Sequence, residues 1–240
     1  MKKNVYGMLV LMLLLLVVAP KTKAQNCNDF MLLKNNAQYE ILTYNSKDKL
    51  ETKATYQVKS VNRSNGQLEA TIHTKVFDNK DKAVSEGEFT VGCDGGTISM
   101  DMRSMMNPGM TEAYKNMEIS MEGDKMLYPG NLRVGQKLEN GTMTMTVKDQ
   151  ASGQAMTTMT MKITDRTVEG KESIKVPAGT YDSFKIRQNT DMENRAMGMK
   201  MPGMQMQTVE YYAPNIGMVR SETYRNGKLM SYSVLSKLSK

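Results

Sequence analysis

Methionine recurs at a spacing of two in three stretches of the second half of the chain, at residues 143–145, 159–161 and 197–206. Because successive side chains of a β-strand point to opposite faces of the sheet, each stretch places its thioethers on one side. The first two stretches predict a hairpin that turns between residues 148 and 154. Its apolar, inward face is expected to be made by Met143, Met145, Met159 and Met161.

The third stretch contains Pro202-Gly203, a pair that is common in turns. If this pair makes a two-residue turn, Met201 faces Met204 and Met199 faces Met206, so that four sulfurs lie within cross-strand contact distance. Thioether sulfur is a soft ligand that favours Cu(I). The 197–206 hairpin is therefore a candidate copper site made by Met199, Met201, Met204 and Met206.

The rest of the chain has the pattern of an antiparallel meander. Turn signals such as Asn65-Gly66, Gly95-Gly96 and Asn226-Gly227 separate short segments rich in β-branched and aromatic residues. About twelve strands are expected, with one short helix near residues 108–117, where Pro-Gly precedes a segment of low β character. The predicted fold class is all-β, a meander that forms a strongly curved sheet or a half-open barrel.

The N-terminus has the pattern of a secretory signal peptide. Lys2-Lys3 precedes an apolar run over residues 8–19, and Thr22-Lys23-Ala24 supplies small residues at the cleavage positions. A membrane anchor is the alternative, but the run is short for a transmembrane helix. We therefore expect residues 1–24 to be removed and residues 25–240 to form a single exported β domain without a transmembrane segment. Its expected location after cleavage is the periplasm, or the cell surface or the medium if the protein is secreted.

The charge of the chain depends on this cleavage. Lys2, Lys3, Lys21 and Lys23 would leave with the peptide, so 28 of the 32 basic side chains would remain against 25 acidic ones. The formal charge falls from +7 to +3. The remaining basic residues are dispersed among acidic ones and form no stripe, so nucleic acid is not an expected partner.

The chain has two cysteines, Cys27 and Cys93. In an exported protein the direct interpretation is a disulfide between them. A reactive thiol or a metal pair would need an environment that lowers the thiol pKa or a motif such as Cys-x-x-Cys, which is absent. The residues before Cys27 also lack the small apolar residues of a bacterial lipoprotein site, so we expect this cysteine to be unlipidated.

Two segments resemble a known family. Residues 168–182, Val-Glu-Gly-Lys-Glu-Ser-Ile-Lys-Val-Pro-Ala-Gly-Thr-Tyr-Asp, and residues 211–219, Tyr-Tyr-Ala-Pro-Asn-Ile-Gly-Met-Val, resemble the TapB-like exported proteins of Bacteroidota. They are also similar to wider families that share the Val-Pro-Ala-Gly-Thr-aromatic-Asp turn. The resemblance covers nearly the whole mature chain and implies an exported, β-rich protein with no assigned catalytic residues.

No catalytic constellation is visible in the sequence. His73 is the only histidine, and no Gly-x-Ser-x-Gly elbow accompanies it. Zinc sites of histidine and cysteine are excluded by count, and phosphate-binding glycine loops are absent. A pair of carboxylates brought together by the fold stays open. We expect no enzymatic activity, no catalytic residue and no cofactor.

Three interpretations of the methionines remain. They can fill an irregular core, because methionine is flexible and polarizable. They can line a concave face that accepts a hydrophobic small molecule or a lipid, with Met143, Met145, Met159 and Met161 as the binding residues. They can bind Cu(I) through the 197–206 hairpin, and a purely structural or adhesive role in the envelope is the remaining alternative. If other side chains bury these methionines, they belong to the core; if they are exposed or line a cavity, they form a binding surface.

Overall fold

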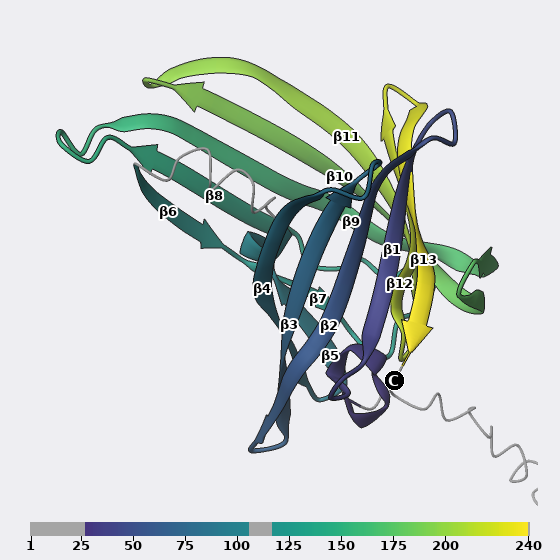
Figure 1. Cartoon of the computed structure of the whole chain (residues 1–240). Coiled ribbons are helices and arrows are strands. Elements are labelled where there is room, and N and C mark those ends of the chain that lie inside the picture. Colours follow the sequence, from purple (N-terminus) through teal and green to yellow (C-terminus); the bar gives the residue numbers. More distant parts are fainter. Residues whose placement is uncertain (1–26, 106–116, 240) are drawn as a thin grey trace, which may run out of the picture.

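The computed structural model describes residues 27–105 and 117–239, which form one antiparallel sheet of 13 strands (Figure 1). The sheet curls into a nearly closed barrel, so the predicted all-β meander is confirmed. In chain order the strands are β1 (Gln38–Asn45), β2 (Leu50–Ser64), β3 (Gln67–Asp78), β4 (Ala83–Asp94), β5 (Thr97–Asp101), β6 (Glu118–Gly123), β7 (Lys125–Tyr128), β8 (Gly141–Lys148), β9 (Ala155–Val176), β10 (Gly179–Ala196), β11 (Met199–Ala213), β12 (Gly217–Arg225) and β13 (Lys228–Ser239).

The strand order across the sheet is β6-β8-β9-β10-β11-β12-β13-β1-β2-β3-β4-β5-β7. Most neighbours are consecutive in the chain, and the last strand, β13, pairs with the first, β1. In Figure 1 these two strands, yellow and dark blue, lie side by side. The free ends of the β8–β9 and β10–β11 hairpins project away from β1–β4. The barrel therefore opens on that side.

Helix is confined to short 3-10 segments in the described part of the chain: η1 (Cys27–Asp29), η2 (Met31–Leu33) and η3 (Met102–Met105). The helix expected near residues 108–117 falls almost entirely outside the described residues. Only Met117 of that segment is described, and it lies in a bend. Among the described residues no helix is long and apolar enough to cross a membrane.

Two-residue Asn-Gly turns form at both predicted positions. Asn65-Gly66 and Asn226-Gly227 have positive φ at both residues, the backbone that a tight antiparallel hairpin needs. Met197-Gly198 has the same conformation, with φ of 49° and 78°, and reverses the chain between β10 and β11. The expected turn at Pro202-Gly203 is therefore wrong.

Pro202 and Gly203 lie instead inside β11, at a shift of register opposite Met192 and Asn194. A Cβ at Gly203 would come within 2.8 Å of the Met192 carbonyl oxygen, so the bulge requires glycine there. A second irregularity lies at Asp165, whose φ is 54°. The chain passes through it without ending the strand, so that β9 is one strand of 22 residues.

The two edge strands of the sheet, β6 and β7, are joined through Asp124. Its backbone N–H donates to the Thr142 carbonyl oxygen at 2.9 Å, and its carbonyl accepts from the Met102 N–H at 3.0 Å. Beyond this point the loop after β7 bonds to β9, with Leu138 N–H donating to the Arg166 carbonyl at 2.8 Å. These contacts draw the two ends of the sheet together and close this side of the barrel.

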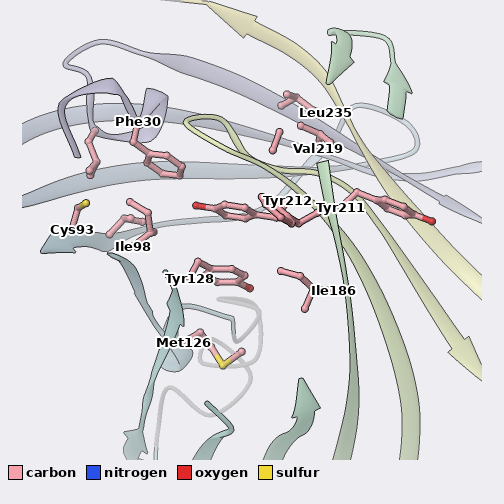
Figure 2. Packing of buried hydrophobic residues seen from close by; sticks show 14 of the residues in the cluster. Phe30, Cys93, Ile98, Met126, Tyr128, Ile186, Tyr211, Tyr212, Val219 and Leu235 are labelled. Atoms are coloured by element: carbon pink, nitrogen blue, oxygen red, sulfur yellow. The ribbon is translucent and has the colours of Figure 1, made fainter. Parts of the chain in front are cut away.

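The N-terminal segment covers one end of the barrel. Cys27 and Cys93 form the predicted disulfide, with a Cα separation of 5.7 Å, which fastens η1 to β4. Phe30 is almost fully buried, and in Figure 2 it lies near Cys93 and Ile98. The Met31 N–H donates to the Asn215 carbonyl at 2.8 Å, which ties the same segment to the loop before β12.

Removing the disulfide should weaken the fold. The bond closes a loop with a sequence separation of 66 residues, so the chain-entropy model predicts a loss of about 4 kcal/mol on replacing both cysteines by serine. Urea unfolding of the oxidised protein and of the Cys27→Ser, Cys93→Ser variant measures this difference. Equal unfolding midpoints and slopes would show that the N-terminal segment is not held by the bond.

Candidate functional site

The alternating methionines form one continuous surface on the inner face of the sheet. Cross-strand partners share a face, and the register pairs Met143 with Met161, Met161 with Met192, and Met192 with Met204. Met145 pairs with Met159 and with Met121. We call this surface the methionine face and define it as Met121, Met143, Met145, Met159, Met161, Met192, Met199, Met201, Met204 and Met206.

Exposure rises along the methionine face from the core toward the hairpin ends. Met143 and Met145 are 0% and 1% exposed, whereas their partners Met161 and Met159 are half-buried. Further along β11, Met201 is 45% exposed and Met199 is 68% exposed. Two of the four predicted ligand-binding residues therefore belong to the core, and the other two lie at its border.

The residues of the candidate copper site do not face one another as expected. Because the turn is at Met197-Gly198, Met204 pairs with Met192, Met201 with Asn194, and Met199 with Ala196. The four sulfurs thus follow one strand instead of meeting in pairs across a hairpin. The described part of the chain also contains no group of three or more histidine, cysteine, aspartate or glutamate side chains that could hold a metal ion.

Methionine also fills the core beside the methionine face. Met102 and Met126 are fully buried, and both sulfurs converge on Gly141. A Cβ at Gly141 would lie 2.5 Å from the Met102 Sδ and 2.9 Å from the Met126 Sδ, so these thioethers occupy the space that a side chain would need. Flexible methionine suits such an irregular gap.

A buried polar cluster lies deeper in the barrel, where β9, β10 and β11 meet β7. It consists of Arg166, Gln188, Glu210 and Tyr128. Arg166 Nε donates to Gln188 Oε1 at 3.0 Å, and Gln188 Nε2 donates to Glu210 Oε1 at 3.1 Å. The Tyr128 hydroxyl donates to Glu210 Oε2 at 3.0 Å. The cluster therefore runs across the interior from one end of the sheet to its middle.

Arg166 is only 1% exposed, and it also bonds to groups outside this cluster. Its Nη1 donates to the carbonyl oxygens of Leu127 and Glu139, at 3.2 and 2.9 Å. Its guanidinium lies 4.9 Å from the centre of the Tyr128 ring, which in turn stacks on Tyr212 at 5.1 Å (Figure 2 shows both rings). One guanidinium nitrogen, Nη2, is buried without a hydrogen-bond partner among the described residues.

The bulge at Asp165 explains why Arg166 points inward. Register shifts between Arg187 and Asn189, so that two residues of β9, Asp165 and Arg166, lie opposite Gln188. Asp165 is exposed and accepts a hydrogen bond from Asn189 Nδ2 at 2.9 Å, while Arg166 enters the interior. Beta-bulges commonly redirect a side chain in this way.

Burial governs the protonation of the cluster. It raises the pKa of the Glu210 carboxyl above its ordinary value, although Arg166 and the hydrogen bonds from Tyr128 and Gln188 act in the opposite direction. Burial, together with the charge of Glu210, also raises the pKa of the Tyr128 phenol well above its ordinary value. Tyr128 therefore stays a neutral donor.

The polar cluster was not predicted from the sequence. Gln188 and Glu210 occupy inward positions of period-two segments, next to Ile186 and Tyr212, and a polar residue at such a position is the available signal. Arg166 carries no such signal, because the bulge shifts its phase. Most donors and acceptors of the cluster are hydrogen-bonded to other members of the cluster. Its role is therefore to link strands.

Arg166→Met should destabilise the protein by about 3–5 kcal/mol, because it leaves Gln188 Oε1 and two carbonyl oxygens without their donor and removes the positive charge that acts on Glu210. The matched control is Arg187→Met on the outer face of the neighbouring strand, where the arginine is half-exposed and pairs with Glu169. That change should cost less than about 1 kcal/mol. Urea unfolding measures both. A similar loss in the two variants would contradict a bracing role for the cluster.

The raised pKa of Glu210 predicts an unusual dependence of stability on pH. A carboxyl whose pKa is raised in the folded state binds its proton more tightly there than in the unfolded chain. Its contribution to the free energy of unfolding is therefore fully present below its unfolded pKa of about 4.3. That contribution is lost as the pH rises through the folded pKa. Glu210→Gln removes this titration. Unfolding free energies from pH 4 upward should therefore fall more steeply with pH for the wild type than for the variant. Parallel curves would show that Glu210 titrates normally.

Two solved structures are similar to this one. A protein from Bacteroides fragilis NCTC 9343, provisionally described as exported and with a YmcC-like fold, matches with a TM-score of 0.68 and 25% identity, over 90% of this chain and 100% of its own. A protein from Parabacteroides distasonis ATCC 8503, provisionally described as a lipoprotein, matches with a TM-score of 0.70 and 23% identity, over 88% and 98% of the two chains.

The second similarity establishes the fold alone. Among curated proteins, none matches the chain. One family model matches residues 34–235, which extend from the N-terminal segment to the last strand. The chain therefore belongs to the DUF3108-like family.

Proposed function

We propose that this protein is an exported binding protein of the cell envelope, without catalytic activity, that holds an apolar chain on its methionine face. The single observation that carries the proposal is the gradient of exposure along that face, from the fully buried Met143 to the exposed Met199. If the methionines only filled the core, their period-two pattern would stop where the wall of the barrel stops. Here the same period-two pattern continues onto the projecting hairpins.

The dimensions of the methionine face suit an extended apolar ligand. The row Met143, Met161, Met192 and Met204 crosses four strands, which span about 14 Å at the usual interstrand spacing. Its members beyond β8 are half-buried and lie next to solvent. Unbranched thioether side chains can repack around ligands of different shape, which is typical of promiscuous apolar surfaces. A hydrophobic small molecule or a lipid acyl chain is therefore the proposed ligand.

The other interpretations explain less of the pattern. Core filling accounts for Met102, Met126 and Met143 but leaves the half-exposed residues without a role. Cu(I) binding by Met199, Met201, Met204 and Met206 was based on sulfurs facing one another across a turn at residue 202, whereas the turn is at residue 197. Export is supported by the pattern of residues 1–24 and by the description of the Bacteroides relative. The narrower TapB-like assignment stays a prediction.

Binding of an acyl chain can be measured with a fluorescent sixteen-carbon fatty-acid probe. Met192→Gln combined with Met204→Gln places two polar amides in the half-buried row, so the affinity should fall by at least about tenfold, which corresponds to 1.4 kcal/mol. The matched control is Met230→Gln on β13, because Met230 is exposed at 48% and lies outside the methionine face. It should bind as the wild type does.

Native mass spectrometry of the protein purified from its host envelope tests the ligand class directly. A co-purifying lipid adds a mass of several hundred daltons, whereas a copper ion adds about 63 and would favour the alternative site. If the wild-type protein neither binds the probe nor carries a lipid adduct, the proposal is refuted.

A further inference from the structure

The outer face of the same projecting strands carries a polar groove. One part of it has a volume of about 430 Å³ and is lined by side chains of β9, β10, β11 and the β12–β13 turn. An adjoining part of about 600 Å³ shares Asp191, Gln205 and Asn226 with the first. Both volumes lie in the range of small-molecule sites. The polar residues of its lining lie on the opposite face of the strands from the methionine face, although Met192, Met204 and Met206 also contribute to the lining.

Unequal strand lengths create this groove. β11 pairs with β12 only as far as Gln207 opposite Tyr224, and then continues for eight more residues toward Met199 without β12 beside it. The β12 strand ends at Arg225 and turns at Asn226-Gly227. The turn therefore forms one wall, and the outer faces of β10 and β11 form the floor.

The register arranges the polar side chains of the floor in rows. Thr164, Asn189, Gln207 and Tyr224 are successive cross-strand partners on β9, β10, β11 and β12. In the next row of the same face, Lys162, Asp191 and Gln205 are partners. Rows lie about 7 Å apart along the strands and neighbours within a row about 5 Å apart. A small ion could contact only neighbouring members of these rows, whereas an oligosaccharide has hydroxyl groups far enough apart to bond to both rows.

Much of the hydrogen-bonding capacity in the groove is unused by the protein. Within the described ranges no hydrogen bond engages the side-chain amides of Gln205, Gln207 or Asn226. Each amide offers both donors and an acceptor, and the carboxylates of Asp165 and Asp191 add acceptors. A ligand with many hydroxyl groups, each of them a donor and an acceptor, complements this set.

Charge argues against an anionic ligand. The part of the groove lined by the amides contains Asp165 and Asp191 and no lysine or arginine. The adjoining part is lined by Lys162, Lys200 and Arg225 as well as by Asp191 and Glu193, and Lys162 pairs with Glu193 at 3.0 Å. A neutral ligand is therefore favoured in the part lined by the amides. The hydrogen bond to Glu222 raises the pKa of Tyr224 to about 12, so its phenol stays neutral at the edge of the groove.

An added peptide strand fits the groove less well than a polyol. The free edge of β11 contains Pro202, which has no N–H, and the irregularity between Met201 and Met204 interrupts the ladder of backbone groups that strand addition requires. The available partners are thus side chains on the face of the sheet, not a regular backbone edge.

We propose that this outer groove is a binding site for a neutral carbohydrate, with Asn189, Gln205 and Gln207 as its central hydrogen-bonding residues. It is separate from the apolar site on the methionine face, so either site can exist without the other. Tyr224 and Asn226 flank the sugar, and Asp191 accepts from its hydroxyl groups.

The test is a titration of the ¹⁵N-labelled full protein, followed by NMR of its side-chain amides, with neutral hexasaccharides of glucose, mannose, galactose and xylose at millimolar concentration. At least one of them should shift the amide resonances of Asn189, Gln205 and Gln207. Gln205→Ala combined with Gln207→Ala should weaken its binding by at least about tenfold. The matched control, Gln57→Ala on the outer face of β2, should leave the affinity unchanged.

The same experiment can overturn the proposal. It fails if none of the four oligosaccharides shifts these resonances, or if the double variant binds as tightly as the wild type. Stronger binding of an acidic oligosaccharide such as oligogalacturonate, or of an extended peptide in place of the sugars, also refutes it. The Met161→Gln variant changes the methionine face at a residue that lines neither part of the groove. It should retain carbohydrate binding, which separates a failure here from a failure of the apolar site.

Discussion

The guanidinium of Arg166 holds together parts of the sheet that the backbone ladder alone leaves apart. It donates to carbonyl oxygens of the β7 end and of the loop before β8, and through Gln188 it reaches Glu210 on β11. A buried charge of this kind gains nothing over well-packed apolar residues in stability, but once present it is costly to break. Its bonds to several strands therefore fix one closed arrangement of a sheet whose two ends, β6 and β7, have no direct ladder between them.

Closure at one side makes the opening at the other side possible. The disulfide, η1 and η2 cover one end of the barrel, and the polar cluster and the loop after β7 brace the wall next to it. The β8–β9 and β10–β11 hairpins can then extend beyond the core without further partners, because their bases belong to a fixed wall (Figure 1). A hairpin pair with one apolar face would be only marginally stable alone. Anchored in this way, it exposes that face at the mouth of the barrel.

Period-two patterns and Asn-Gly turns were sufficient to predict the fold class and the pairing of the methionine strands, and the presence of two cysteines in an exported chain was sufficient to predict the disulfide. They were not sufficient where a bulge shifts the phase of a strand. One extra residue at Asp165 moves Arg166 to the inner face, and another near Pro202 keeps Met201 and Met204 on one strand where a turn was expected. A bulge costs little locally, and its position is decided by packing and by hydrogen bonds between strands distant in sequence. The polar cluster and the outer groove depend on such contacts, so the sequence alone did not predict them.

Between the two bulges, regular alternation gives this part of the sheet two chemically different faces. Alternation assigns the even positions of β10 and β11 to the inside, from Ile186 to Met192 and from Tyr212 to Met204, and the odd positions Asn189, Asp191, Gln205 and Gln207 to the outside. A one-residue slip would exchange these sets, placing carboxylates and amides against the core and methionines in the groove. The cost of burying those polar groups keeps the register. The same constraint that makes the hairpins fold correctly thus gives the protein an apolar surface and a polar one, back to back on three strands.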